Sequence, residues 1–196
     1  MKKIFILLIL ALVSGQINAQ NVKKTDAAGS VVILLTHPDF EKSKANKALI
    51  DAVKDIPQVK IVDLYATPLD VEFYKKTLTE AKAVVFQFPF YWASAPSQLK
   101  KWFDEVFISL AGTEAVKGKP AFVATTTGSE YEAYRSGGRN QFTIDELLRP
   151  YQVAVNHSGM VWLTPFAVYG TSRPEAEKNI KEGAKEYRKR IEALIK

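Results

Sequence analysis

The 196-residue chain contains no cysteine, which excludes disulfides, thiolate metal ligands and a lipid anchor on cysteine. Its two histidines, His37 and His157, lack the spacing of metal ligands, so we expect no metal site. The sequence also lacks a G-x-G-x-x-G motif after its first predicted strand, a Walker loop and a G-x-S-x-G nucleophile elbow. These absences argue against a classical dinucleotide fold, a P-loop enzyme and a serine hydrolase.

The amino terminus differs from the rest of the chain. Two lysines precede an apolar run over residues 4–13, and small and polar residues follow up to Ala19. This order is typical of a secretory signal peptide, and the run is too short for a permanent membrane span. We therefore predict a signal peptide over 1–19, a flexible leader over 20–30 and one exported, periplasmic domain over 31–196. A retained signal anchor is the alternative, and the protein is cytoplasmic if the segment is no signal.

The formal net charge of +6 does not indicate a nucleic-acid partner. Much of the positive charge lies in residues 178–196, where acidic and basic side chains interleave as on a solvated helix. We therefore expect no binding of nucleic acid.

Apolar runs alternate with segments of helical periodicity along the whole domain. The predicted strands cover 31–35, 59–64, 83–88, 121–126 and 161–169, and the predicted helices cover 43–53, 71–79, 96–109, 144–156 and 174–195. This alternation predicts an α/β fold in which helices cover both faces of a five-stranded parallel sheet. The flavodoxin-like three-layer sandwich, with strand order 2-1-3-4-5, is the natural arrangement. We expect Pro150 to kink or interrupt its helix.

The loop after the first predicted strand leads directly into a helix and can hold an anion. Backbone amides at the helix start and the side chains of Ser43 and Asn46 can donate hydrogen bonds, and His37 or Lys44 can add positive charge. With Ala45 between them, these residues are candidates to bind a phosphate. A capped helix beside a solvated histidine explains the same residues equally well.

The loop after the third predicted strand is rich in aromatic residues. Its sequence runs through Pro89, Phe90, Tyr91, Trp92 and Ala93. Ligands of open α/β sheets bind outside the carboxyl ends of the strands, so these rings can offer flat apolar faces to a flat ligand. Each ring taken alone can equally belong to the core.

The loop after the fourth predicted strand carries Thr126, Thr127, Gly128 and Ser129. Hydroxyl groups and a glycine permit close approach and hydrogen bonds to the edge of a ring, although a threonine-rich strand end and turn need no ligand. The three loops should meet at one edge of the sheet. A phosphate site, a flat wall and polar groups together fit flavin mononucleotide (FMN).

Several groups of residues form a pattern that occurs in a known family. They are residues 36–38 with 43–46, 86–92 with 96–104, 126–129, 142–150, 159–160 and 165–166. This pattern resembles the flavodoxin-fold NAD(P)H:quinone oxidoreductases, the DT-diaphorase-like family. It is most similar to the bacterial branch, which includes the ancillary reductases of glutathione-gated potassium efflux systems and the general stress flavoproteins. The resemblance covers residues 31–170.

The resemblance implies a homodimer with FMN at its interface, NAD(P)H as electron donor and a quinone or similar small acceptor in a ping-pong reaction. FAD is less favoured because the chain lacks the long carboxyl-terminal extension of the animal enzymes. Tyr134 matches a tyrosine that some relatives place beside the flavin, and Tyr131 is a second candidate for an aromatic lid. The histidine that accompanies this tyrosine has no counterpart here. Arg139 is the candidate to stabilise an anionic flavin or bind a nicotinamide phosphate.

Export puts the electron donor in question, because an exported protein meets little NADH or NADPH. The alternative function is therefore an exported flavin-binding module that transfers electrons or regulates a partner without nicotinamide turnover. Steady-state turnover of a nicotinamide–quinone pair distinguishes the two.

Overall fold

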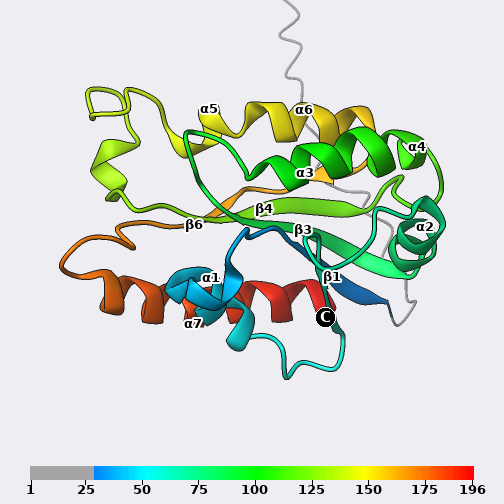
Figure 1. The fold of residues 1–196 in the computed structure, drawn as a ribbon, viewed down its shortest axis with the longest axis horizontal. Helices are drawn as coiled ribbons and strands as arrows, with labels where there is room; N and C mark the ends of the chain where they lie inside the picture. Colours follow the sequence, from blue (N-terminus) through cyan, green and yellow to red (C-terminus); the bar gives the residue numbers. More distant parts are fainter. Residues whose placement is uncertain (1–28) are drawn as a thin grey trace, which may run out of the picture.

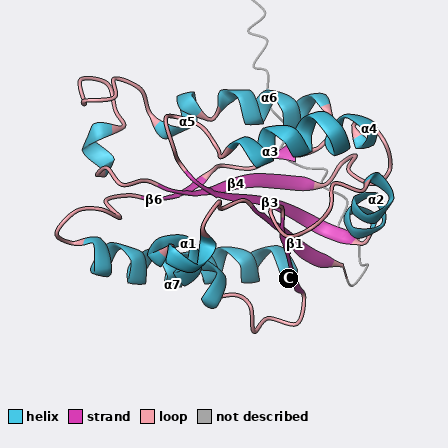
Figure 2. Ribbon diagram, in the orientation of Figure 1, coloured by secondary structure: helices cyan, strands magenta, loops and turns pink. Residues whose placement is uncertain are grey.

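The computed structural model describes residues 29–196, so the predicted signal peptide and nearly all of the predicted leader lie outside the described residues. A central sheet lies between two layers of helices (Figures 1 and 2). The helices are α1 (Lys44–Asp51) and α7 (Ala176–Ile195) on one face, and α3 (Ser97–Trp102), α5 (Ile144–Leu147) and α6 (Arg149–His157) on the other. The predicted three-layer sandwich is confirmed.

The strands pair in parallel in the order β2-β1-β3-β4-β5, as predicted. Their bounds are β1 (Ser30–Leu35), β2 (Val59–Asp63), β3 (Ala81–Pro89), β4 (Pro120–Thr126), β5 (Val161–Trp162) and β6 (Phe166–Val168). The inner strands β1, β3 and β4 are buried almost throughout, because helices cover both faces of the sheet. The continuous apolar runs of the sequence reflect this double burial.

The prediction of one strand over 161–169 is wrong, because two short strands occupy this edge. β5 pairs with the beginning of β4, and β6 pairs with its end. Between them the guanidinium of Arg190 donates hydrogen bonds to the backbone carbonyls of Thr164 and Pro165. Pro165 has no N–H to give to a strand ladder, and these carbonyls are bound by a side chain, so pairing stops there.

Helix ends agree with capping rules. Ser43 caps α1, and Asp70 caps α2 (Val71–Thr79) by accepting the N–H of Phe73 at 2.6 Å. The predicted interruption at Pro150 is confirmed, because α5 ends before Leu148 and the proline occupies the first turn of α6. None of the described helices is long and apolar enough to cross a membrane.

The helix predicted over 96–109 is present but contains a change of helical pitch. Pro96 lies at its amino-terminal cap, α3 follows, and a π-helical segment, η2 (Phe103–Phe107), leads into α4 (Ile108–Leu110). The wider turn places the rings of Trp102 and Phe107 in a stacked contact, with ring centroids 5.3 Å apart. Both rings are buried against the sheet.

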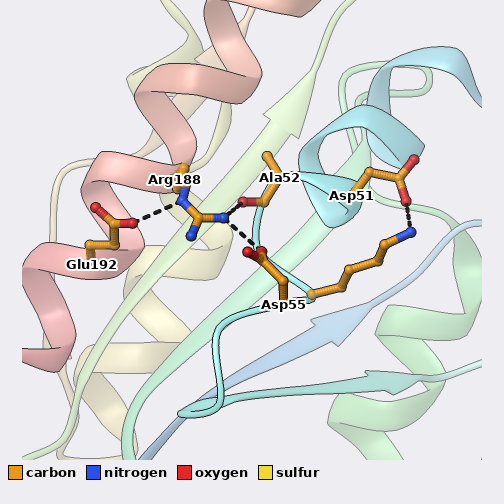
Figure 3. A network of polar contacts seen from close by, with 6 residues as sticks. Asp51, Ala52, Asp55, Arg188 and Glu192 are labelled. Carbon is orange, nitrogen blue, oxygen red and sulfur yellow. Dashed lines mark hydrogen bonds and ion pairs between the residues drawn. The ribbon is translucent and has the colours of Figure 1, made fainter.

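Each face of the sheet has its own apolar core. On the face covered by α1 and α7, polar contacts of Arg188 connect α7 to the end of α1 beside this core (Figure 3). Its guanidinium donates to the carbonyl of Ala52 at 2.7 Å and the carboxylate of Asp55 at 2.6 Å, and its Nε donates to Glu192 at 2.8 Å. The carboxyl-terminal helix is therefore fixed to the end of α1, whose beginning forms part of the site described next.

Candidate functional site

Three loops leave the sheet at the carboxyl ends of β1, β3 and β4. The register pairs Leu35 with Gln87 and Pro89 with Thr126, so the adjacent strand ends lie at one edge. This edge is where open parallel sheets bind ligands. The geometry therefore brings the predicted phosphate loop, aromatic loop and threonine-rich loop to the same side of the molecule.

The first loop is ordered by its own hydrogen bonds. Oγ of Ser43 accepts the backbone N–H of Asn46 at 3.1 Å, so Ser43 acts as the predicted cap. Ala45 and Asn46 are buried at the start of α1, whereas Lys44 is exposed. The side chain of Asn46 turns inward and donates to Oγ1 of Thr126 at 2.9 Å, so its amide is already engaged within the protein.

His37 lies in the same loop with only 7% of its surface exposed. Its ring lies edge-on to Tyr91 and to Phe40, at centroid distances of 6.2 and 6.3 Å. Burial lowers the pKa of His37, and the nearby carboxylates of Asp39 and Asp63 partly oppose this effect. Nearby, the hydroxyl of Thr36 is fully buried and has no hydrogen-bond partner among the described residues.

The aromatic loop contains a tight turn with an unusual backbone. Tyr91 and Ser94 exchange two backbone hydrogen bonds of 2.9 Å, and between them Trp92 and Ala93 have φ angles of 50° and 59°. Left-handed conformations cost about 1–2 kcal/mol per non-glycine residue and concentrate at functional sites. In this turn the Trp92 side chain is 100% exposed, so its ring is free to stack against a flat ligand.

Tyr151 of α6 anchors the end of this aromatic loop, a role that the sequence analysis missed. Its hydroxyl accepts the backbone N–H of Ala95 at 2.8 Å and lies 3.0 Å from Oγ of Ser94. The Tyr151 ring packs on Phe88, with centroids 5.3 Å apart. No local sequence signal identifies this tyrosine, because its partners are more than fifty residues away.

The threonine-rich loop is held by backbone contacts. Thr127 donates its N–H to the carbonyl of Val168 and its hydroxyl to the carbonyl of Ser129, both at 2.8 Å. A Cβ on Gly128 would lie 3.0 Å from Oγ of Ser172, which is tighter than normal contact. The glycine therefore serves close packing against the loop after β6.

A cavity of about 550 Å³ joins the aromatic loop to the threonine-rich loop. It is lined by Phe90, Trp92, Ala93, Ser129, Tyr134, Asn140, Phe142 and Leu147. Six of these residues have apolar or aromatic side chains, and no charged residue lines the space. The first loop does not line this cavity. His37 of that loop contacts Tyr91, whose sequence neighbours Phe90 and Trp92 line the cavity.

Of the two predicted catalytic residues, Tyr134 lines this cavity and Arg139 contacts a residue that lines it. Tyr134 is 8% exposed, lines the cavity and contacts Phe90 edge-to-face at 6.1 Å. Arg139 does not line the cavity itself, but its guanidinium donates to Oγ of Ser129, which does. Tyr131 packs on Tyr169 outside the cavity, so Tyr134 is the better placed of the two candidate lid tyrosines.

Comparison with known proteins agrees with this geometry. A family model described as a flavodoxin-like fold matches residues 30–191. An uncharacterized NAD(P)H oxidoreductase of Bacillus subtilis is 39% identical over 168 residues, which cover 82% of this chain and 85% of the relative.

Two solved structures are also similar to this chain. General stress protein 14 of Treponema denticola, in complex with FMN, is 27% identical, with a TM-score of 0.78 over 84% of this chain and 99% of its own. An NADPH-quinone reductase from P. pentosaceus is 26% identical, with a TM-score of 0.72 over 83% of this chain and 97% of its own. The family resemblance inferred from the motifs is confirmed.

Proposed function

The chain belongs to the flavodoxin-like fold family, and on this premise we propose that it is an FMN-dependent NAD(P)H:quinone oxidoreductase. The observation that carries the proposal is the single cavity shared by the aromatic loop and the threonine-rich loop. The NAD(P)H oxidoreductase and quinone reductase among its relatives, and the FMN held by another, support the same activity.

The residues at this edge fit FMN. Phe90, Trp92 and Tyr134 would hold the flat ring, and Ser129 and Asn140 offer hydrogen-bonding groups to its polar edge. The start of α1, with the Ser43 hydroxyl and the neighbouring His37, would hold the phosphate.

When bound, FMN supplies a ring that accepts and donates hydride, so NAD(P)H, quinone and a proton become NAD(P)⁺ and hydroquinone in two half-reactions of a ping-pong scheme. The protein's own task is to bind, orient and exclude water. Tyr134 and Phe90 form an apolar wall against solvent. Arg139, held by Ser129, places positive charge near the rim, where it would favour negative charge on the ring or on a nicotinamide phosphate.

A visible absorption spectrum tests the proposal directly. The purified protein is incubated with FMN and then mixed anaerobically with NADPH or NADH. Flavin bands that bleach and recover on addition of a quinone would establish the activity. Bound flavin that does not bleach would instead favour an exported electron-transfer module, and absence of bound flavin would overturn both functions.

The Trp92→Ala variant tests where the ring binds. We expect the Kd for FMN to rise at least about fivefold, because a stacked aromatic side chain contributes on the order of 1 kcal/mol or more. The free energy of unfolding of the apoprotein should not change, since the Trp92 side chain is fully exposed. Ile108→Ala, at another exposed apolar residue, is the matched control. An unchanged Kd in Trp92→Ala would contradict this placement.

We also propose that the protein is an exported homodimer. A partner subunit would close the open side of the cavity, next to the aromatic loop. Analytical ultracentrifugation with and without FMN tests the dimer, and a stable monomer in both conditions would contradict it. Mass spectrometry of protein recovered from the periplasm tests export, with residue 20 as the expected new terminus.

A further inference from the structure

A chain of buried polar side chains crosses the protein beneath the candidate site. This polar chain consists of Tyr187 of α7, Gln87 of β3, Asn46 of α1 and Thr126 of β4. The Tyr187 hydroxyl donates to Oε1 of Gln87 at 2.9 Å, Nε2 of Gln87 donates to the backbone carbonyl of Asn46 at 3.1 Å, and Nδ2 of Asn46 donates to Oγ1 of Thr126 at 2.9 Å. Its four members come from four elements, and all are buried.

The direction of every bond in the polar chain is fixed by one group. The backbone carbonyl of Asn46 can only accept, so Gln87 must turn its NH₂ group toward it and its Oε1 toward Tyr187. The same NH₂ group lies 3.4 Å from Oδ1 of Asn46, which leaves Nδ2 of Asn46 to face Thr126. All donors in the chain therefore point from Tyr187 toward Thr126.

The polar chain ends with an unused donor. Oγ1 of Thr126 accepts from Asn46, so its hydroxyl hydrogen must find an acceptor elsewhere. Within residues 29–196 the hydroxyl donates to no protein group. Thr126 is the last residue of β4, at the edge of the sheet where the three loops meet, and Thr127 to Ser129 follow it directly. The acceptor is therefore a group outside these residues, and a ligand bound at this edge can supply it.

We propose that Gln87 and Tyr187 are positioning residues that make Thr126 a hydrogen-bond donor to an acceptor atom of bound FMN. The inference rests on the proposed function, because FMN is the ligand. An apolar side chain at position 87 would suit residues 83–88 of β3, which are otherwise apolar, and buried polar groups add little net stability even when fully paired. A role in orienting the site accounts for the glutamine better than a role in stability.

Tyr187→Phe is the first variant to make. It removes one hydroxyl and keeps the ring that packs on Phe166 at 5.3 Å. Without this donor, Oε1 of Gln87 is left buried and unpaired, so the Gln87 amide shifts toward another donor and its contact with Asn46, and through it the position of Thr126, is disturbed. Tyr74→Phe is the matched control, because Tyr74 is equally buried, its hydroxyl has no partner among the described residues, and it lies in the opposite core. Both variants are checked for folding by circular dichroism.

The measurement is the Kd for FMN, read from quenching of flavin fluorescence, together with the visible spectrum of the bound flavin. For Tyr187→Phe we expect about a tenfold higher Kd and shifted flavin bands, and for Tyr74→Phe a Kd within about twofold of the wild type. Thr126→Val should raise the Kd similarly, and Thr126→Ser should keep the wild-type value.

A double-mutant cycle separates positioning from general destabilisation. If the polar chain acts only through the Thr126 hydroxyl, the Tyr187→Phe/Thr126→Val double variant has the same Kd as Thr126→Val alone. Additive effects, or an unchanged Kd in folded Tyr187→Phe, would overturn the inference while wild-type FMN binding still supports the proposed function. A wild type that binds no FMN would overturn both. Should Tyr187→Phe not fold, Gln87→Met takes its place in the same cycle.

Discussion

Nδ1 of His37 accepts a hydrogen bond from the backbone N–H of Asp39, at 3.1 Å. A neutral imidazole carries one proton, so this bond places it on Nε2. In its neutral form, the buried His37 ring can therefore donate a hydrogen bond from Nε2. This state can bind a phosphate oxygen through Nε2–H, and a second proton would have to displace the bond from Asp39.

The stability of the apoprotein should depend on pH through His37. Because burial lowers its pKa in the folded state, the unfolded chain binds a proton at a higher pH than the folded protein does. The free energy of unfolding should therefore fall as the pH drops below about 6.5 toward the folded-state pKa, and His37 should have no effect well above that pH. Urea unfolding of the wild type and His37→Gln at several pH values measures this. Identical pH dependence in the two proteins would contradict the prediction.

Ala93→Gly should stabilise the apoprotein. The φ angle of Ala93 is 59°, a region that glycine adopts without the steric cost of a Cβ. We expect the free energy of unfolding to rise by about 0.5–1 kcal/mol, because the relief of strain exceeds the entropy that glycine loses. Ala48→Gly, inside α1 and right-handed, is the control and should destabilise by about 1 kcal/mol. A destabilised Ala93→Gly would show that the turn carries no strain.

Tyr134→Phe separates binding from turnover at the cavity rim. The ring contact with Phe90 remains, so the Kd for FMN should stay within about twofold of the wild type. If the hydroxyl stabilises charge during the reaction, kcat with NAD(P)H and a quinone should fall at least about tenfold. Arg139→Gln should lower kcat in the same way. Unchanged kcat in both variants would remove these two residues from the catalytic set.

Lys119 fastens the end of α2 to the sheet. Its Nζ donates to the carbonyls of Leu78, Thr79 and Ala81, at 2.6, 2.7 and 2.7 Å. Lys119→Met keeps the length of the side chain but leaves these carbonyls without their donor, and should lower the free energy of unfolding by about 2 kcal/mol. Lys76→Met, on the exposed face of α2, should change it by less than about 0.5 kcal/mol. Equal effects of the two substitutions on urea unfolding would contradict this role.

Local patterns were sufficient to predict the layers and the strand order. Buried parallel strands are apolar throughout, and helices that cover them show apolar residues on one side, so both are visible in the sequence. The break between β5 and β6 was not visible, because it depends on Arg190, which lies 25 residues beyond Pro165 in the chain. The π turn at η2 was missed because an apolar pattern does not distinguish it from an α-helix.

The position of the site was predictable, but the orientation of its side chains was not. Topology alone brings the carboxyl ends of β1, β3 and β4 to one edge. Asn46, however, binds Thr126, a residue 80 positions away, and no local rule predicts such a partner. Gln87 did give a signal, since it is the one polar residue in the predicted strand over 83–88. The sequence did not indicate its hydrogen-bond partner, Tyr187, which lies 100 residues further along the chain.

The break between β5 and β6 also affects how this protein meets other chains. An outer strand with a long row of open N–H and C=O groups is a template for pairing with another molecule, and so for aggregation. Here that outer row is short on both sides of the break, and Arg190 already binds the carbonyls of Thr164 and Pro165. The interruption therefore protects this margin of the sheet against the addition of a foreign strand.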